Sequence, residues 1–155
     1  SEVETRLIWA GTNDGKLWYT RDGGSRWNDV SKNVGMPAWG VVSKIEPSHF
    51  SGGTAYIAVD AHLTDSREPY IFKTTDYGAT WKRVNGDLPN DHPLSYVKAV
   101  AENPNKQGML FAGTGHAFYY SMDDGSHWTR YMRGLPAAPV IMTVRLVKSM
   151  RSSTR

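Results

Sequence analysis

The chain has 155 residues, of which 39% are hydrophobic and 21% charged, and its formal net charge is +3. This length fits one domain with a hydrophobic core, and no apolar run approaches the roughly 18 residues that a membrane-spanning helix needs. The absence of cysteine excludes disulfides, thiolate metal sites and cysteine nucleophiles, but it leaves the compartment open. The polar N-terminal segment SEVETRLIW does not resemble a signal peptide, although processing would have removed one.

The charges are unevenly distributed along the chain. No acidic residue follows Asp124, whereas six basic residues do: Arg130, Arg133, Arg145, Lys148, Arg151 and Arg155. A basic end can attract phosphate backbones, but no pattern of a nucleic-acid-binding module accompanies it. We therefore expect residues 148–155 to form a disordered basic tail, and we expect no nucleic acid partner.

In chain order, short segments that alternate apolar and polar residues predict half-buried strands, and helix signals are essentially absent. The first group lies near Leu7–Ala10, Lys16–Thr20 and Trp27–Val30. The second lies near Val41–Glu46, Ala55–Val59, Tyr70–Thr74 and Trp81–Val84. The third lies near Tyr96–Glu102, Met109–Ala112, Ala117–Ser121 and Trp128–Tyr131. The first group lacks the opening strand of the other two, for which Val140–Val147 is a candidate.

The last turn of each group contains one eight-residue pattern, which we call the box: a hydroxyl residue, any residue, Asp, any residue, Gly, two residues and Trp. It reads TRDGGSRW at 20–27, TTDYGATW at 74–81 and SMDDGSHW at 121–128. The defining residues are Thr20, Asp22, Gly24, Trp27, Thr74, Asp76, Gly78, Trp81, Ser121, Asp123, Gly125 and Trp128. Four-stranded units that repeat about every 45–50 residues are typical of β-propeller blades.

The residue types in the box indicate a structural role. A glycine at this position suits a turn that needs positive φ or a close backbone approach. The Asp carboxylate can accept backbone N–H bonds within the turn, and the Trp ring can pack between blades. Catalysis on a sugar would need paired carboxylates about 5–10 Å apart, whereas three Asp residues on three blades would lie far from one another.

Three blades are fewer than the four to eight that propellers typically have. A row of three would expose two apolar blade faces, and two copies related by a two-fold axis would cover them. We therefore expect residues 1–147 to form a three-blade domain that is completed to a six-bladed ring in a homodimer. The last strand could close the first blade of its own chain or of its partner. The alternative is a piece of a larger propeller that is completed by some other association.

The longer phrases AGTNDGKLWYTRDGGSRW, YIFKTTDYGATW and FAGTGHAFYYSMDDGSHW resemble the Asp-box, or BNR, repeats of sialidase-like propellers, above all the sortilin and xyloglucanase group. The resemblance covers residues 7–140. It implies that the box lies on the hairpin between the third and fourth strands of each blade, away from the ligand-binding face. The superfamily includes glycosidases, sorting receptors and assembly factors, so the resemblance implies a fold and no single activity. Its members normally have more blades, which implies a shortened member or a fragment.

In such a propeller the ligand face carries the loop between the second and third strands of each blade and the connections between blades. The longest of these loops is DAHLTDSREP at 60–69, and long loops often carry function. The catalytic candidates are Asp60, Asp65 and Glu68. The ligand-binding candidates are Trp39, His62, Arg67, Asp91, His92 and His116. The alternative interpretation is a solvated loop with internal ion pairs and a rim tryptophan that only packs.

No activity follows from these motifs. The arginine trio, the Tyr/Glu pair and the Arg-Ile-Pro motif of sialidases have no match, and neither do the two catalytic Asp residues of xyloglucanase-like enzymes. The five histidines are scattered, so we expect no metal site, and we expect no cofactor. We interpret the chain as a non-catalytic propeller module for protein or carbohydrate interaction. The alternative is a glycoside hydrolase remnant or subunit with its site on the central channel face.

Overall fold

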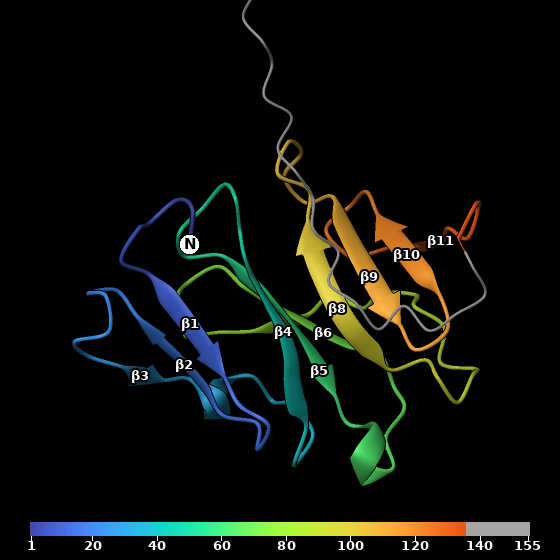
Figure 1. Ribbon diagram of the computed structural model, residues 1–155, viewed down its shortest axis with the longest axis horizontal. Coiled ribbons are helices and arrows are strands. Elements are labelled where there is room, and N and C mark those ends of the chain that lie inside the picture. Colours follow the sequence, from blue (N-terminus) through green and yellow to red (C-terminus); the bar gives the residue numbers. More distant parts are fainter. Residues whose placement is uncertain (136–155) are drawn as a thin grey trace, which may run out of the picture.

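The computed structural model describes residues 1–135, and this part of the chain is almost entirely β-strand (Figure 1). The first sheet contains β1 (Ile8–Gly11), β2 (Leu17–Thr20) and β3 (Asn28–Asp29). The second contains β4 (Val41–Pro47), β5 (Ala55–Asp60), β6 (Tyr70–Thr74) and β7 (Lys82–Arg83). The third contains β8 (Val97–Glu102), β9 (Leu110–Thr114), β10 (Phe118–Ser121) and β11 (Thr129–Arg130). Two single-turn 3-10 helices, η1 (Ser31–Asn33) and η2 (His62–Thr64), lie in loops.

Each sheet is an antiparallel meander in which consecutive strands are neighbours. This arrangement confirms the predicted all-β class and the blade organisation, because a propeller blade is such a four-stranded meander. The opening strands β4 and β8 each contain a register shift against β5 and β9, between Val42 and Lys44 and between Val97 and Ala99. The outer strands β7 and β11 pair over only two residues, fewer than the sequence pattern predicts, because the box turn occupies the residues just before them.

Among residues 1–135 the first sheet has three strands. The candidate for its fourth strand, Val140–Val147, lies outside the described residues, as do the predicted domain boundary at 147 and the basic tail at 148–155.

The hydrophobic core lies between the sheets, in two contacts that we call the first seam and the second seam. The first seam, between the first and second sheets, contains Leu17, Val30, Val34, Ile57, Val59, Ala61, Tyr70 and Phe72. The second seam, between the second and third sheets, contains Tyr56, Ala58, Ile71, Val84, Leu88, Val97, Val100, Leu110, Ala112, Ala117, Tyr119 and Trp128. Because side chains alternate along a strand, the second sheet contributes opposite faces of β5 and β6 to the two seams.

The three boxes have the same internal hydrogen bonds. In the first, the Thr20 hydroxyl donates to Asp22 at 2.7 Å and accepts from the Gly24 N–H at 3.1 Å, and Asp22 accepts from the Arg26 N–H at 2.9 Å. The equivalent bonds in the other two boxes measure 2.8–2.9 Å. The box glycines have φ of +101°, +82° and +83°, a region in which a side chain is strained. The turn therefore depends on its side-chain acceptors and on glycine together.

A buried acid links the second and third sheets at the edge that carries the boxes. Glu102 on β8 is fully buried, and its carboxylate accepts from the Ser48 hydroxyl at 2.7 Å and from the His49 N–H at 3.0 Å. It also accepts from the Gly108 N–H at 3.2 Å and the Tyr56 hydroxyl at 3.3 Å. These four bonds join both sheets, and an apolar replacement would leave the donors without their acceptor.

We predict that Glu102→Ala lowers the free energy of unfolding by about 2–4 kcal/mol, because it leaves several buried donors unpaired. Glu102→Gln should cost less, since its amide oxygen keeps one acceptor. Urea denaturation followed by tryptophan fluorescence measures both. Glu68→Ala, at a half-exposed carboxylate in a loop, is the control and should change stability by less than about 0.5 kcal/mol. Equal losses for Glu102→Ala and Glu68→Ala would contradict the role assigned to Glu102.

We also predict that the boxes make stability depend on pH. Hydrogen bonds from His127 lower the pKa of Asp123 from 3.8 to about 2, and the Arg26 and Thr80 donors lower the pKa of Asp22 and Asp76. A lowered folded-state pKa stabilises the fold above the unfolded-state pKa, and this contribution is lost as pH falls from about 4 towards 2. Asp123→Asn should flatten this dependence in urea titrations between pH 6 and 2.5. Asp14→Asn, in an exposed turn, should leave it unchanged, and an equal effect of both would contradict the prediction.

Candidate functional site

The connections between strands separate onto two edges of the sheets. The box turns lie on one edge, and we call the other the loop edge. It carries the β1–β2, β5–β6 and β9–β10 turns and the connections from each sheet to the next, with η2 at the bottom of Figure 1. All the candidate catalytic and ligand-binding residues lie in these loops or at the strand ends beside them.

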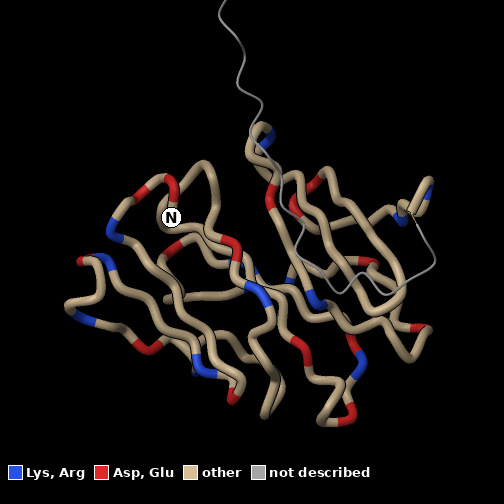
Figure 2. Tube along the Cα trace, viewed as in Figure 1, with Lys and Arg blue, Asp and Glu red and all other residues tan. Residues whose placement is uncertain are grey.

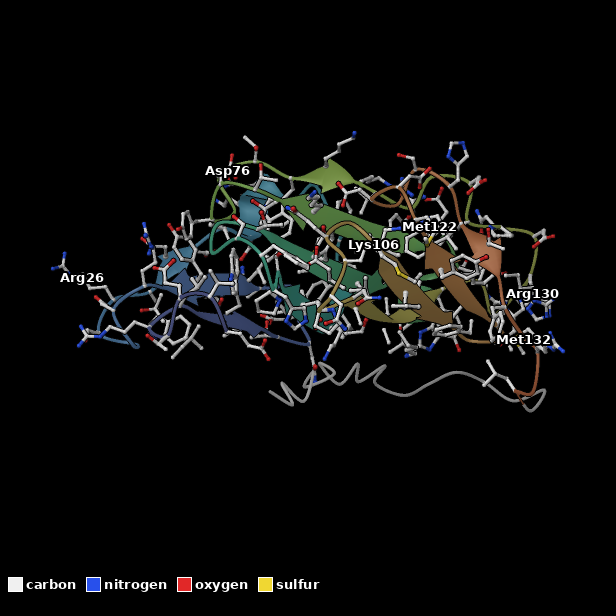
Figure 3. All side chains as sticks on the ribbon, turned by 90° about the horizontal axis from the view of Figure 1, so that it is seen from above. Arg26, Asp76, Lys106, Met122, Arg130 and Met132 are labelled. Carbon is white, nitrogen blue, oxygen red and sulfur yellow. The ribbon has the colours of Figure 1, made fainter. Side chains whose placement is uncertain are left out.

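The loop edge contains a cavity of about 680 Å³ at the second seam, which we call the seam cavity. It is lined by Pro89, Asp91, His92, Leu94, Gly115, His116, Tyr119, Trp128, Arg130 and Met132. Three of the six predicted ligand-binding residues, Asp91, His92 and His116, therefore meet in one cavity. Arg130 and Met132 lie together at the outer end of the third sheet (Figure 3).

The two histidines stack on each other with ring centroids 4.3 Å apart. His92 Nδ1 accepts a hydrogen bond from the Leu94 N–H, and His116 Nδ1 donates to the Leu94 carbonyl, both at 3.0 Å. In the neutral rings this fixes the tautomers, so that Nε2 of His92 carries a proton and Nε2 of His116 carries a lone pair. The pair thus presents one donor and one acceptor, positioned by the backbone of a single residue.

The seam cavity has an aromatic floor and a charged rim. Tyr119 and Trp128 are buried, and the Trp128 indole N–H donates to the Val84 and Gly125 carbonyls at 3.1 Å, which fixes the ring. Burial raises the pKa of Tyr119, so its hydroxyl stays protonated. Asp91 and Arg130 are exposed at the rim and carry opposite charges. An aromatic surface beside directional polar groups suits a ligand with an apolar face and several hydroxyl or amide groups.

Asp60 has a different environment. It is buried at the end of β5, where its carboxylate pairs with Lys98 and accepts from His62 through Nδ1 at 2.6 Å and through the backbone N–H at 3.0 Å. Burial alone would raise the pKa of Asp60, but the hydrogen bonds from Lys98 and His62 outweigh it, and the pKa lies below the ordinary value. His62 also stacks on Tyr96, with ring centroids 4.5 Å apart. Asp60 is therefore ionised, and its carboxylate is already paired with Lys98 and His62. A general acid must instead carry a proton that it can donate.

The remaining candidates are dispersed. Asp65 is exposed and adopts positive φ at the end of η2, and Arg67 is exposed in the same loop. Glu68 lies 3.7 Å from Arg83 in a half-exposed ion pair. Trp39, also at positive φ, is 75% exposed and lies outside the seam cavity. Among residues 1–135, the hydrogen bonds and ion pairs of Asp60 and Glu68 are made to basic residues and not to another candidate carboxylate.

Several residues of these sites had no signal in the sequence motifs. Tyr119, Arg130 and Met132 belong to or follow strands, and only the packing of the third sheet against the 85–95 connection brings them to His92. Lys98 and Tyr96 reach Asp60 and His62 from the start of the next blade. Alternation along β10 predicts the burial of Tyr119, but no local pattern predicts that it lines a cavity.

Two further features are absent from the described part of the chain. Residues 1–135 contain no group of three or more His, Asp or Glu side chains that could hold a metal ion. None of the helical segments in this range is long and apolar enough to cross a membrane. Figure 2 shows basic and acidic residues interspersed along the described trace.

Comparisons with known proteins agree with this architecture. No family model matches the chain. Among curated proteins it is similar to a xyloglucanase of a Paenibacillus species, with 25% identity over 142 residues, 84% of this chain and 14% of that protein. The chain spans about one seventh of the length of the curated relatives it matches.

Among solved structures the chain is similar to YCF48 bound to D1 peptide, with a TM-score of 0.60, 21% identity, and coverage of 80% of this chain and 36% of that one. It is also similar to the GH74 xyloglucanase from Xanthomonas campestris, with a TM-score of 0.58, 22% identity, and coverage of 81% and 18%. The chain therefore has the β-propeller fold, and its sequence is similar to those of glycoside hydrolases.

We predict that Lys98→Ala raises the pKa of Asp60, because burial still opposes ionisation when the ammonium partner is gone. A titration of the side-chain carboxyl by ¹³C NMR measures this shift. Lys82→Ala, at an exposed position on β7, is the matched control and should leave the Asp60 titration unchanged. An unchanged titration in Lys98→Ala would show that Lys98 does not lower the pKa of Asp60.

Proposed function

We propose that the chain is a non-catalytic β-propeller module that binds an oligosaccharide in the seam cavity. The observation that carries the proposal is the combination of an aromatic floor, Tyr119 and Trp128, with a rim of His92, His116 and Arg130. Sugar rings have apolar faces that stack on aromatic side chains, and their hydroxyl groups pair with donors and acceptors at the edge. The volume of about 680 Å³ lies within the range of small-molecule sites.

We propose a non-catalytic module because the candidate carboxylates do not form an acid and base pair. Glycoside hydrolysis needs an acid and a second carboxylate across the scissile bond. Asp60 is committed to Lys98 and His62, and Glu68 is close to Arg83. Asp91 is the one carboxylate among the residues that line the seam cavity, and the other titratable side chains there are His92, His116, Tyr119 and Arg130. This surrounding supports binding more than it supports acid–base chemistry.

The relatives support the ligand class. Curated relatives of this chain are named xyloglucanase, so we take xyloglucan-type oligosaccharides as the first ligands to test. We further infer that the three boxes are Asp-boxes, because their side-chain bonds repeat atom for atom and the phrases resemble that repeat. Membership of an Asp-box family would account for both the blades and the similarity to xyloglucanases.

A second candidate is peptide binding in the same cavity. The observation that favours it is the similarity to the structure of YCF48 bound to D1 peptide. The stacked histidines and the Asp91–Arg130 rim could pair with peptide amides as well as with hydroxyl groups. The affinity for a charged peptide would depend on salt concentration more strongly than the affinity for a neutral sugar does.

The prediction is that xyloglucan oligosaccharides bind the chain and that Arg130→Ala weakens binding about tenfold, the effect of losing one charge-assisted hydrogen bond. Isothermal titration calorimetry measures this. Arg83→Ala is the matched control, because Arg83 has the same position in the second sheet and lies outside the seam cavity. A control that weakens binding equally would contradict the site.

Two outcomes would overturn the proposal. Absence of binding to xyloglucan oligosaccharides, together with binding of peptides that Arg130→Ala abolishes, would favour the second candidate. Turnover of chromogenic glycosides that Asp60→Asn or Asp65→Asn abolishes would show that the chain is a glycoside hydrolase after all.

A further inference from the structure

The two seams use the same contact at the box edge. In the first, a Cβ placed on Gly78 would lie 3.0 Å from a methyl carbon of Val30, the residue that follows β3. In the second, a Cβ on Gly125 would lie 2.2 Å from the carbonyl oxygen of Val84, the residue after β7. At Gly125 the approach leaves no space for a side chain, at Gly78 a side chain would crowd Val30, and the positive φ of both residues also favours glycine. We call the box glycine and tryptophan the socket, and the residue after the outer strand of the preceding sheet the knob.

A second residue accompanies each knob. Val34 follows Val30 by four positions, and Leu88 follows Val84 by four. All four side chains are buried in their seams. A hydrogen bond joins the same two segments in each seam. In the first seam the Asn33 side-chain amide donates to the Gly78 carbonyl at 2.9 Å, and in the second the backbone N–H of Trp128 donates to the Asp87 carboxylate at 2.6 Å. The seam is thus a repeated unit, with a knob pair on one sheet and a socket on the next.

The first sheet has a socket without a knob among residues 1–135. A Cβ on Gly24 would have only the Trp27 ring within 4 Å. Trp27 is 42% exposed, whereas Trp128 in the filled socket is 7% exposed. Ile8 pairs with the box residue Thr20 as Leu110 pairs with Ser121, yet Ile8 is exposed and Leu110 is fully buried. This face of the first sheet is apolar and uncovered in the described chain.

Within the described part of the chain, the third sheet has a knob pair without a socket. Tyr131 and Leu135 follow β11 with the spacing of Val84 and Leu88, and they are 46% and 42% exposed. The same face of this sheet carries Phe118, which alternates with the buried Tyr119 and stacks on Phe111 at 5.8 Å. Arg26 beside the open socket and Arg130 beside the open knobs lie at opposite ends of the molecule (Figure 3).

We propose that a second copy of this chain occupies both faces, with Tyr131 and Leu135 of each copy packed against Gly24 and Trp27 of the other. The two faces are the halves of a contact that the chain already makes twice, which is why a second copy fits them. The described residues of each copy leave one socket and one knob pair open, so two copies joined head to tail close into a ring of six sheets, within the usual range for propellers. This inference does not depend on the proposed function.

The test is the mass of the 155-residue chain in solution. We expect sedimentation equilibrium to give twice the chain mass of 17.3 kDa. Trp27→Ala and Tyr131→Glu should each raise the dimer dissociation constant at least about tenfold, because each removes a central apolar side chain from both contacts. Circular dichroism verifies that both variants are folded. Leu63→Glu, at an exposed apolar residue of the loop edge, is the control and should leave the dimer intact.

A mixture of the two variants distinguishes head-to-tail contacts from self-complementary ones. A mixed dimer of Trp27→Ala and Tyr131→Glu has one contact with both residues intact, so the mixture should dimerise more tightly than either variant alone. The proposal is overturned if the wild-type chain is a monomer over the accessible concentrations, in which case other blades occupy these faces. Assemblies larger than a dimer, or a mixture no tighter than its components, would overturn it equally.

Discussion

The contact between a box glycine and the outer strand of the preceding blade is the constraint on which the rest of this structure depends. At Gly78 and Gly125 the positive φ makes the turn, and the missing side chain admits Val30 or Val84. The hydroxyl and carboxylate of the box replace the backbone bonds that the turn gives up. One short motif thus determines a hairpin and the spacing between two sheets.

This contact explains where a site can form. The boxes pack the blades together at one edge, so the packing of the blades does not depend on the loops at the opposite edge. The 85–95 connection crosses the second seam there and places His92 on His116, which belongs to a different turn. Asp60 and Lys98 bridge the same seam from β5 to β8. Both clusters are properties of a blade pair, and neither exists within one blade.

The same distinction explains how far the sequence could predict the molecule. Strand positions follow from alternation and from the box, since both act within about ten residues. Asp91, His92 and His116 were expected on the ligand face from the order of loops in a propeller, but their meeting in one cavity was not predicted, because the 85–95 connection crosses to the third sheet. The engagement of Asp60 by Lys98 was not predicted either, because the two lie 38 positions apart and meet only through seam packing. Glu102 was missed for a related reason: an acid in a strand is usually exposed, and its four donors come from other segments.

Binding and assembly are separable in this architecture. The seam cavity lies between the second and third sheets, so every residue that lines it comes from one chain. A central channel, by contrast, is lined by the inner strands of all the blades of a ring. The described residues provide two such strands in four-stranded blades, β4 and β8. A ligand that uses the seam cavity should therefore bind a single copy as well as an assembled ring. A reaction that needs carboxylates facing each other across the channel could occur only in the ring.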